Sequence, residues 1–170
     1  KTTTYIIYPY NNDASSIISP LDIKKNYPLT WSYLSKVKDM SNTKRNSNGP
    51  WYGYTRKQNL KLLNSPKLFV PMTNKNITCF VQEPGFYGDN SNLNAIVDDD
   101  NNINRLKALA VIFNSEIFNL LAIGVSGDAS NGYHKFNKQF LEQVPIPLLN
   151  TQEIGDLANL YDTINSLVIS

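Results

Sequence analysis

The amino-acid sequence predicts an α+β fold with a mixed, mainly antiparallel central sheet, flanking helices and a C-terminal amphipathic helix. Short alternating or β-branched runs, separated by turn-forming residues, fill the middle of the 170-residue chain. Apolar residues with helical spacing lie on either side of these runs, at residues 27–40 and beyond residue 103. The hydrophobic share of 41% is ordinary for a folded domain and argues against a disordered chain.

The first third of the chain is expected to begin with a strand and to continue with a helix. Residues 2–10, "TTTYIIYPY", alternate and are β-branched, which is typical of a strand. Residues 27–40, "YPLTWSYLSKVKDM", have a proline at their start and Trp31, Leu34 and Val37 at helical spacing, and so predict a helix. The polar run "SNTKRNSNGP" that follows predicts a loop.

Four short runs predict the central strands. We expect Lys67 to lie at the exposed end of the first of these strands, residues 67–71. Cys79, the single cysteine, cannot form a disulfide within the chain, and we expect a small buried side chain in a reducing compartment. The runs are "KLFVP" (67–71), "ITCFVQ" (77–82), "GFYG" (85–88) and "LNAIV" (93–97), with Pro84-Gly85 and "GDNSN" as turns.

The last third is predicted to be mainly helical. Residues 103–125 are apolar on most faces, which predicts buried helices, and Ser115 is positioned to cap the second of them. Residues 124–147 predict a flexible loop and a short helix that prolines end. The terminal helix, residues 151–168, has no capping box at Thr151, because no Glu or Gln stands three residues on. Its apolar stripe consists of Ile154, Leu157, Leu160, Tyr161, Ile164 and Leu167.

Charge is strongly segregated along the chain, although the net charge is only +2. Residues 24–75 contain eleven basic side chains and one acid, Asp39, a net charge of +10, whereas residues 76–170 contain four basic side chains and eleven acids, a net charge of −7. A positive face binds polyanions, because contacts to phosphates release condensed counterions. A solvated lysine-rich surface above buried aromatic residues is the alternative. A carbohydrate-binding surface would use Trp and Tyr but has no need of this charge.

Several classes of function are disfavoured by what the sequence contains. His134 and Cys79 are the single residues of their kinds, so a metal site of the usual ligand type is not expected. The acidic residues 98–100 predict a solvated loop, since further calcium ligands do not follow at the required spacing. Neither a phosphate-binding glycine loop nor a nucleophile elbow is present. The apolar runs are far shorter than the roughly 20 residues of a membrane span, and a secretory signal is missing, so we expect a cytoplasmic location and no membrane partner.

The candidate binding residues are basic, amide and aromatic side chains between residues 24 and 61. Lysines suit phosphate contacts, whereas in a groove Arg and Lys match guanine and Asn and Gln match adenine. The phosphate candidates are Lys24, Lys25, Lys36, Lys38 and Lys61, and the groove candidates are Lys44, Arg45, Arg56, Lys57, Gln58 and Asn59. The aromatic candidates Trp51, Tyr52 and Tyr54 alternate around Gly53, so they either contact DNA or form core.

Seven segments of the chain occur in the order and spacing of a known family. They are "YIIYPY", "YPLTWSYLSKVKDM", "WYGYTR", "SPKLFVP", "FYGDN", "LKALAVIFNSEIFNLL" and "GYHKFNKQFLEQVPIP", and they span residues 5–147. In this order they resemble the C-terminal target-recognition domain of TaqI-like adenine-specific DNA methyltransferases, including fused restriction-modification enzymes. The closing "VPIPLL" and helix are similar to the end of a recognition unit in type I specificity subunits.

The resemblance implies a domain for recognition of double-stranded DNA at residues 1–149 and a helix at residues 150–170 that packs on it or on a partner. It further implies a catalytic methyltransferase domain upstream of Lys1, with S-adenosylmethionine as cofactor, in a prokaryotic, cytoplasmic type II enzyme that can also carry an endonuclease. An "NPPY" or "DPPY" motif is absent from the sequence. We therefore expect the fragment itself to have no catalytic residues, to bind no cofactor and to methylate nothing.

Two other classes of function remain open from the residues. Trp51, Tyr52 and Tyr54 could form a carbohydrate-binding surface. The apolar stripe of the terminal helix could bind another protein or a second copy of the chain.

Overall fold

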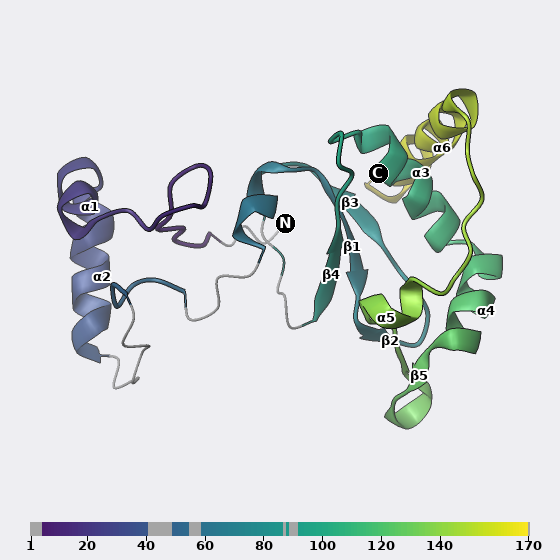
Figure 1. Ribbon diagram of the computed structural model, residues 1–170, viewed down its shortest axis with the longest axis horizontal. Helices are drawn as coiled ribbons and strands as arrows, with labels where there is room; N and C mark the ends of the chain where they lie inside the picture. Colours follow the sequence, from purple (N-terminus) through teal and green to yellow (C-terminus); the bar gives the residue numbers. More distant parts are fainter. Residues whose placement is uncertain (1–4, 41–48, 55–58, 87, 89–91, 170) are drawn as a thin grey trace. The chain divides into compact units, whose positions relative to one another are not determined.

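The chain forms two compact units, Lys1–Lys61 and Leu62–Ser170. Helices and antiparallel sheets are both present, which confirms the α+β class (Figure 1). The division between the units falls inside residues 1–149, which the sequence predicted as one recognition domain. The computed structural model describes residues 5–40, 49–54, 59–86, 88 and 92–169.

The unit Lys1–Lys61 is built on two consecutive helices, α1 (Pro20–Asn26) and α2 (Pro28–Met40). Ser19 caps α1, because its hydroxyl accepts a hydrogen bond from the backbone N–H of Asp22. The helix predicted at residues 27–40 is confirmed as α2, whereas α1 was not predicted. The core of the unit is Ile23, Leu34 and Tyr52, against which Ile17, Ile18, Trp31 and Trp51 pack.

The predicted N-terminal strand is wrong for the residues that the structure describes. Residues 5–9 belong to no strand, and the only pairing of their neighbourhood is an isolated bridge between Tyr10 and Ile17. Pro9 has no N–H to donate to a strand ladder. The carbonyl of Ile7 instead accepts a hydrogen bond of 2.7 Å from the hydroxyl of Tyr54. A side chain thus supplies a donor that a neighbouring strand would supply in a sheet.

The larger sheet of the unit Leu62–Ser170 has the strand order β3-β1-β4, and both pairings are antiparallel. Its central strand is buried on both faces, as its continuous apolar run suggests. The strands predicted at residues 67–71 and 93–97 are confirmed as β1 and β4. The bounds are β1 (Lys67–Pro71), β3 (Phe80–Gln82) and β4 (Leu93–Ile96).

The strand predicted at residues 77–82 forms only in its second half, as β3. Asparagine side chains pair with the backbone before it. Asn119 Oδ1 accepts from the N–H of Ile77 at 2.6 Å, and Asn114 accepts from the N–H of Cys79 and donates to its carbonyl, each at 2.9 Å. These amides satisfy backbone groups that would otherwise need a neighbouring strand.

Two further predictions at this sheet are wrong. The described residues of 85–88 form no strand, because Gly85 has φ of 91° and makes a turn there. Lys67 is not exposed at the end of its strand: it is only 2% exposed, and its Nζ donates to the carbonyls of Phe86 at 3.0 Å and Leu63 at 3.4 Å. Burial lowers the pKa of Lys67 below its ordinary value.

The helices of the second unit follow the predicted pattern, with one correction. Ser115 is confirmed as an N-cap, since its hydroxyl accepts from the N–H of Phe118. A capping box does precede the terminal helix: Asn150 Oδ1 accepts from the N–H of Glu153 at 3.0 Å, and Glu153 Oε2 accepts from the N–H of Asn150 at 2.8 Å. The box begins at Asn150, one residue before Thr151, the position at which the sequence predicted none. The bounds are α3 (Ile103–Phe113), α4 (Glu116–Val125), α5 (Lys138–Leu141) and α6 (Thr151–Ile169).

The core of the second unit lies between the larger sheet and the helices. The terminal helix α6 packs on α3, and α3 packs on β1 and β3 (Figure 1). Phe113 and Phe118 stack with ring centres 4.1 Å apart, and Phe136 is fully buried. Among the described residues no single helix is long and apolar enough to cross a membrane; α3 and α4 reach that apolarity only together and are bent by 78° between them.

A second, small sheet has the order β2-β6-β5 with antiparallel pairings. It replaces much of the flexible loop that the sequence predicted before the short helix α5. Asn131 and Gly132, with φ of 62° and 73°, turn the chain at the tip of its hairpin. The bounds are β2 (Thr73–Asn74), β5 (Gly127–Asp128), η2 (Ser130–Gly132) and β6 (His134–Lys135).

Candidate nucleic-acid interface

Four of the predicted phosphate-binding lysines project from the two helices of the unit Lys1–Lys61. Lys24 and Lys25 lie in the last turn of α1, Lys36 and Lys38 lie in the second half of α2, and all four side chains are exposed. Positive charge near a helix C-terminus also interacts favourably with the helix dipole. Within the described part of the chain, the first three form no ion pair with a carboxylate. Their exposed side chains place three positive charges on the surface of this unit.

Lys38 and Lys61 are also exposed, and each has a neighbour inside the unit. The Nζ of Lys38 lies 5.8 Å from the centre of the Trp51 ring, at cation–π range. The pKa of the Asp13 carboxyl is lowered, chiefly by hydrogen bonds from Ser15 and to a small extent by the positive charge of Lys61. Neither contact removes the lysine charge from the surface.

The outer face of α2 joins these charges to exposed apolar side chains. Leu29, Tyr33 and Lys36 stand at spacings of four and three residues, so they share one side of the helix. Leu29 is 86% exposed and Tyr33 is 58% exposed. Leu34, which belongs to the core, lies on a different side of α2. The sequence analysis missed this face, although the same helical spacing that placed Leu34 inside could have placed Leu29 and Tyr33 outside.

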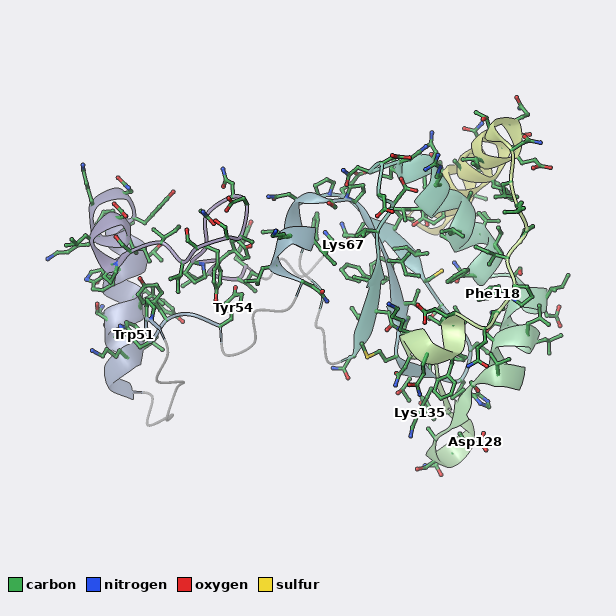
Figure 2. The ribbon with its side chains drawn as sticks, in the orientation of Figure 1. Trp51, Tyr54, Lys67, Phe118, Asp128 and Lys135 are labelled. Carbon is green, nitrogen blue, oxygen red and sulfur yellow. The ribbon has the colours of Figure 1, made fainter. Side chains whose placement is uncertain are left out.

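Tyr52 is a core residue of the unit. Its side chain is 5% exposed, and its hydroxyl donates a hydrogen bond of 2.6 Å to the carbonyl of Ile18. Trp31 and Trp51 pack edge-on against its ring, with ring centres 6.3 and 5.6 Å away. Burial, and secondly the negative charge of Asp22, raise the pKa of Tyr52. Tyr52 is therefore not placed to contact DNA, whereas Trp51 is only half-buried. Figure 2 labels Trp51 beside α2.

Tyr54 connects the aromatic turn to the N-terminal segment. Its ring centre lies 5.4 Å from that of Tyr10 and 6.3 Å from that of Tyr8. Its backbone N–H donates to the hydroxyl of Tyr10 at 2.8 Å, and the hydroxyl of Tyr8 donates to the carbonyl of Leu60 at 3.1 Å. A Cβ at Gly53 would lie 2.8 Å from Cδ1 of Ile17, which can move, and 3.2 Å from the backbone carbonyl oxygen of Pro50, so a side chain at this position would be crowded. Tyr54 is half-buried and holds the turn in place.

An open groove of about 850 Å³ lies in the same unit, between the N-terminal segment and the two helices. Ile6, Ile7 and Ile17 contribute apolar walls, while Asn26 and Tyr27 bring polar groups from the junction of α1 and α2. The sequence analysis did not predict this groove, since α1 itself was not predicted. Its polar lining adjoins the exposed Lys24 and Lys25 along the chain.

Most of the positive charge lies in the first of the two units, although the basic segment 24–75 extends past the division at Lys61. The unit Lys1–Lys61 contains ten basic and three acidic side chains, a net charge of +7, and the unit Leu62–Ser170 contains six basic and eleven acidic ones, a net charge of −5. The eleven basic residues of 24–75 do not all share one face, because Lys67 is buried.

Of the predicted groove candidates, the structure describes Asn59, which is exposed and has φ of 58°. The candidates Lys44, Arg45, Arg56, Lys57 and Gln58 lie outside the described residues.

The remaining reactive side chains are engaged in structural contacts. Cys79 is buried, as predicted, and burial raises its pKa to about 12, so its thiol stays protonated. Nδ1 of His134 lies 3.2 Å from Ser126 Oγ, which also donates to the carbonyl of Ile123 at 2.9 Å. Asp98 and Asp100 both pair with Arg105. Among the described residues, His, Cys, Asp and Glu do not gather into a group of three or more that could hold a metal ion.

The amino-acid sequence matches no protein-family model, and it matches no curated protein. Function therefore has to be inferred from the charges and contacts of the residues described above.

Proposed function

We propose that this chain is the sequence-specific recognition module, for double-stranded DNA, of an adenine-N6 DNA methyltransferase in a cytoplasmic, prokaryotic restriction-modification system. The observation that carries the proposal is the exposed set of helix lysines, Lys24, Lys25 and Lys36, which have no carboxylate partner among the described residues. A unit with a net charge of +7 attracts a polyanion, and lysine side chains bind the phosphates of a DNA backbone with release of condensed counterions.

Phosphate contacts and base contacts have different roles in the proposed complex. Lys24, Lys25 and Lys36 neutralise backbone phosphates and fix the register of the duplex. The exposed Tyr33 and Leu29 bring ring and apolar surface beside Lys36. Discrimination between bases is assigned to the amide and guanidinium candidates predicted from the sequence, because those groups match the donor and acceptor pattern of the major groove.

A recognition module serves methylation by positioning the target. An adenine inside a duplex must be extruded before a methyl group can reach it, so the enzyme has to grip the DNA while the base leaves the stack. In this proposal the chain supplies the grip, and a methyltransferase domain of the same parent protein supplies the chemistry and binds S-adenosylmethionine. The chain itself carries no catalytic role.

A protein-interaction function is the second candidate, and one observation favours it. Leu160, Ile164 and Leu167 of α6 are exposed and lie on one side of the helix. A partner would cover this stripe. A carbohydrate site on Trp51, Tyr52 and Tyr54 is disfavoured, because Tyr52 is buried and its hydroxyl is already bonded to Ile18.

The proposal is tested by fluorescence anisotropy of a labelled DNA duplex at several salt concentrations. We expect binding whose log K falls with log salt concentration, and a slope that becomes shallower by about 0.9 for each phosphate contact removed. Lys24→Gln, Lys25→Gln and Lys36→Gln are the test variants. Lys138→Gln is the control, because Lys138 is also exposed but pairs with Glu142 at 3.4 Å. Absent or salt-independent binding by the wild-type chain would contradict the proposal.

A further inference from the structure

Two lysines of the acidic unit Leu62–Ser170 differ from its other basic residues. Four of the six basic side chains are engaged inside the unit: Lys67 with carbonyls, Arg105 with Asp98 and Asp100, Lys107 with Asp162 at 2.7 Å, and Lys138 with Glu142. Lys75 and Lys135 have no carboxylate partner among the described residues, and both are exposed.

Both unpaired lysines lie on one face of the small sheet. The register pairs Thr73 with Lys135 and Asn74 with His134, so the residue after β2, Lys75, comes opposite Tyr133. Alternate residues of a strand share a face, which puts Lys75, Tyr133 and Lys135 on the same side of the sheet. The contact between the Lys75 Nζ and the Tyr133 ring, 5.7 Å from its centre, agrees with this placement. We name this set the Lys75–Tyr133–Lys135 face.

Asp128 and Glu142 each lie seven residues from Lys135 in the sequence, and neither pairs with it: Glu142 pairs with Lys138, and Asp128 lies on the other side of the small sheet. Asp128 is opposite His134 in the register, and both belong to the other side of the sheet. The Asp128 carboxylate is 4.0 Å from His134 Nδ1. Figure 2 labels Lys135 and Asp128 on this part of the chain. Among the described residues, no carboxylate forms an ion pair with a lysine of the Lys75–Tyr133–Lys135 face.

The core holds the face in a fixed position. Phe136, the residue after β6, is fully buried. Its N–H donates to the carbonyl of Met72 at 2.8 Å, and its carbonyl accepts from the side chain of Asn94 at 2.7 Å. Met72 directly precedes β2, so both strands that carry the lysines are tied to the core. A pre-ordered site loses less conformational entropy on binding.

We propose that the Lys75–Tyr133–Lys135 face binds the phosphate backbone of DNA, as a second contact site on the unit whose net charge is negative. This inference rests on the proposed function and extends it to residues outside the segment 24–61. The ammonium groups of Lys75 and Lys135 and the phenol hydroxyl of Tyr133 can each donate a hydrogen bond to a phosphate oxygen. Asn, Gln and Arg side chains are missing from these three positions, so the face contributes affinity and register but no base discrimination.

The test compares salt dependence of DNA binding in variants of the full 170-residue chain. In Lys75→Gln/Lys135→Gln the slope of log K against log salt is expected to become shallower by about 1.8, two contacts at about 0.9 each. Lys75→Arg/Lys135→Arg keeps both charges and should keep the wild-type slope. Lys138→Gln, an exposed lysine already paired with Glu142, is the control and should leave the slope unchanged.

The possible outcomes separate this inference from the proposed function. A wild-type slope in Lys75→Gln/Lys135→Gln, with a shallower slope in Lys24→Gln/Lys25→Gln, would overturn the second site and leave the proposed function standing. A loss about half as large in Lys138→Gln, which removes one charge instead of two, would also overturn it, because net charge alone would then explain the effect. Failure of the wild-type chain to bind DNA would overturn both.

Discussion

Replacement of Tyr52 by phenylalanine should destabilise the unit Lys1–Lys61 without weakening its affinity for DNA. The ring remains in place against Trp31 and Trp51, but the hydrogen bond of 2.6 Å to the carbonyl of Ile18 is lost. A neutral hydrogen bond contributes roughly 0.5–1.5 kcal/mol, and an acceptor left unsatisfied costs roughly 1–3 kcal/mol. Ile18 is half-buried, so water reaches its carbonyl only in part. We expect the free energy of unfolding to fall by about 1–2 kcal/mol.

The same substitution should remove a pH dependence. The pKa of Tyr52 is raised in the folded chain, by burial and then by the charge of Asp22. The unfolded chain therefore loses the phenol proton first, near its ordinary pKa of about 10, and the folded state holds it to higher pH. The contribution of Tyr52 to the free energy of unfolding is fully present below about pH 10. It is lost as the pH rises through the pKa of Tyr52 in the folded state. Tyr52→Phe should lack this loss.

Urea unfolding followed by tryptophan fluorescence measures both effects. Both tryptophans of the chain, Trp31 and Trp51, lie in this unit and contact Tyr52, so the signal reports on the right structure. Tyr27→Phe is the control, because Tyr27 is 55% exposed and outside the core. A change no larger than that of Tyr27→Phe, or a loss of DNA affinity with stability unchanged, would refute the assignment of Tyr52 to the core.

Two predictions concern the second unit. Cys79 should resist alkylation by iodoacetamide at pH 8 in the folded chain and react readily in urea, because burial raises its pKa to about 12; rapid labelling of folded protein would contradict the buried thiol. Asn119→Ala should lower the free energy of unfolding by about 1–3 kcal/mol, measured by circular dichroism in urea, because the N–H of buried Ile77 loses its acceptor. Asn104→Ala, on the exposed side of α3, should change it far less.

Helices and apolar strands of this fold could be predicted from the sequence because their signals are local. Pro28 and the spacing of Trp31 and Leu34 are enough to specify α2. Ser115 stands directly before an apolar run, which identifies an N-cap. The seven-residue helix α1 is too short for periodicity to reveal it, although Ser19 followed by Pro20 was a usable start signal.

Other features depend on residues that are distant in the chain. The backbone at Ile77 and Cys79 is satisfied by Asn119 and Asn114, 42 and 35 residues away, so the alternation of residues 77–82 alone overestimated the strand. Lysine is a residue type normally found at the surface. The buried Lys67 instead donates hydrogen bonds from its ammonium group to two backbone carbonyls, those of Leu63 and Phe86. Of the candidate site, the exposure of the helix lysines was predictable, whereas the face of Lys75, Tyr133 and Lys135 required the register of three strands.

The concentration of aromatic residues beside positive charge has a structural cause in this protein. The described part of the unit Lys1–Lys61 contains no sheet, so backbone carbonyls of its irregular segments need other donors. Tyrosine hydroxyls provide them: Tyr8, Tyr52 and Tyr54 donate to carbonyls 52, 34 and 47 residues away. The rings meanwhile bury apolar area that a unit of this size has little other means to supply. The aromatic cluster thus holds α1 and α2 in place, and the lysines on those helices are the groups left to bind DNA in the proposed complex.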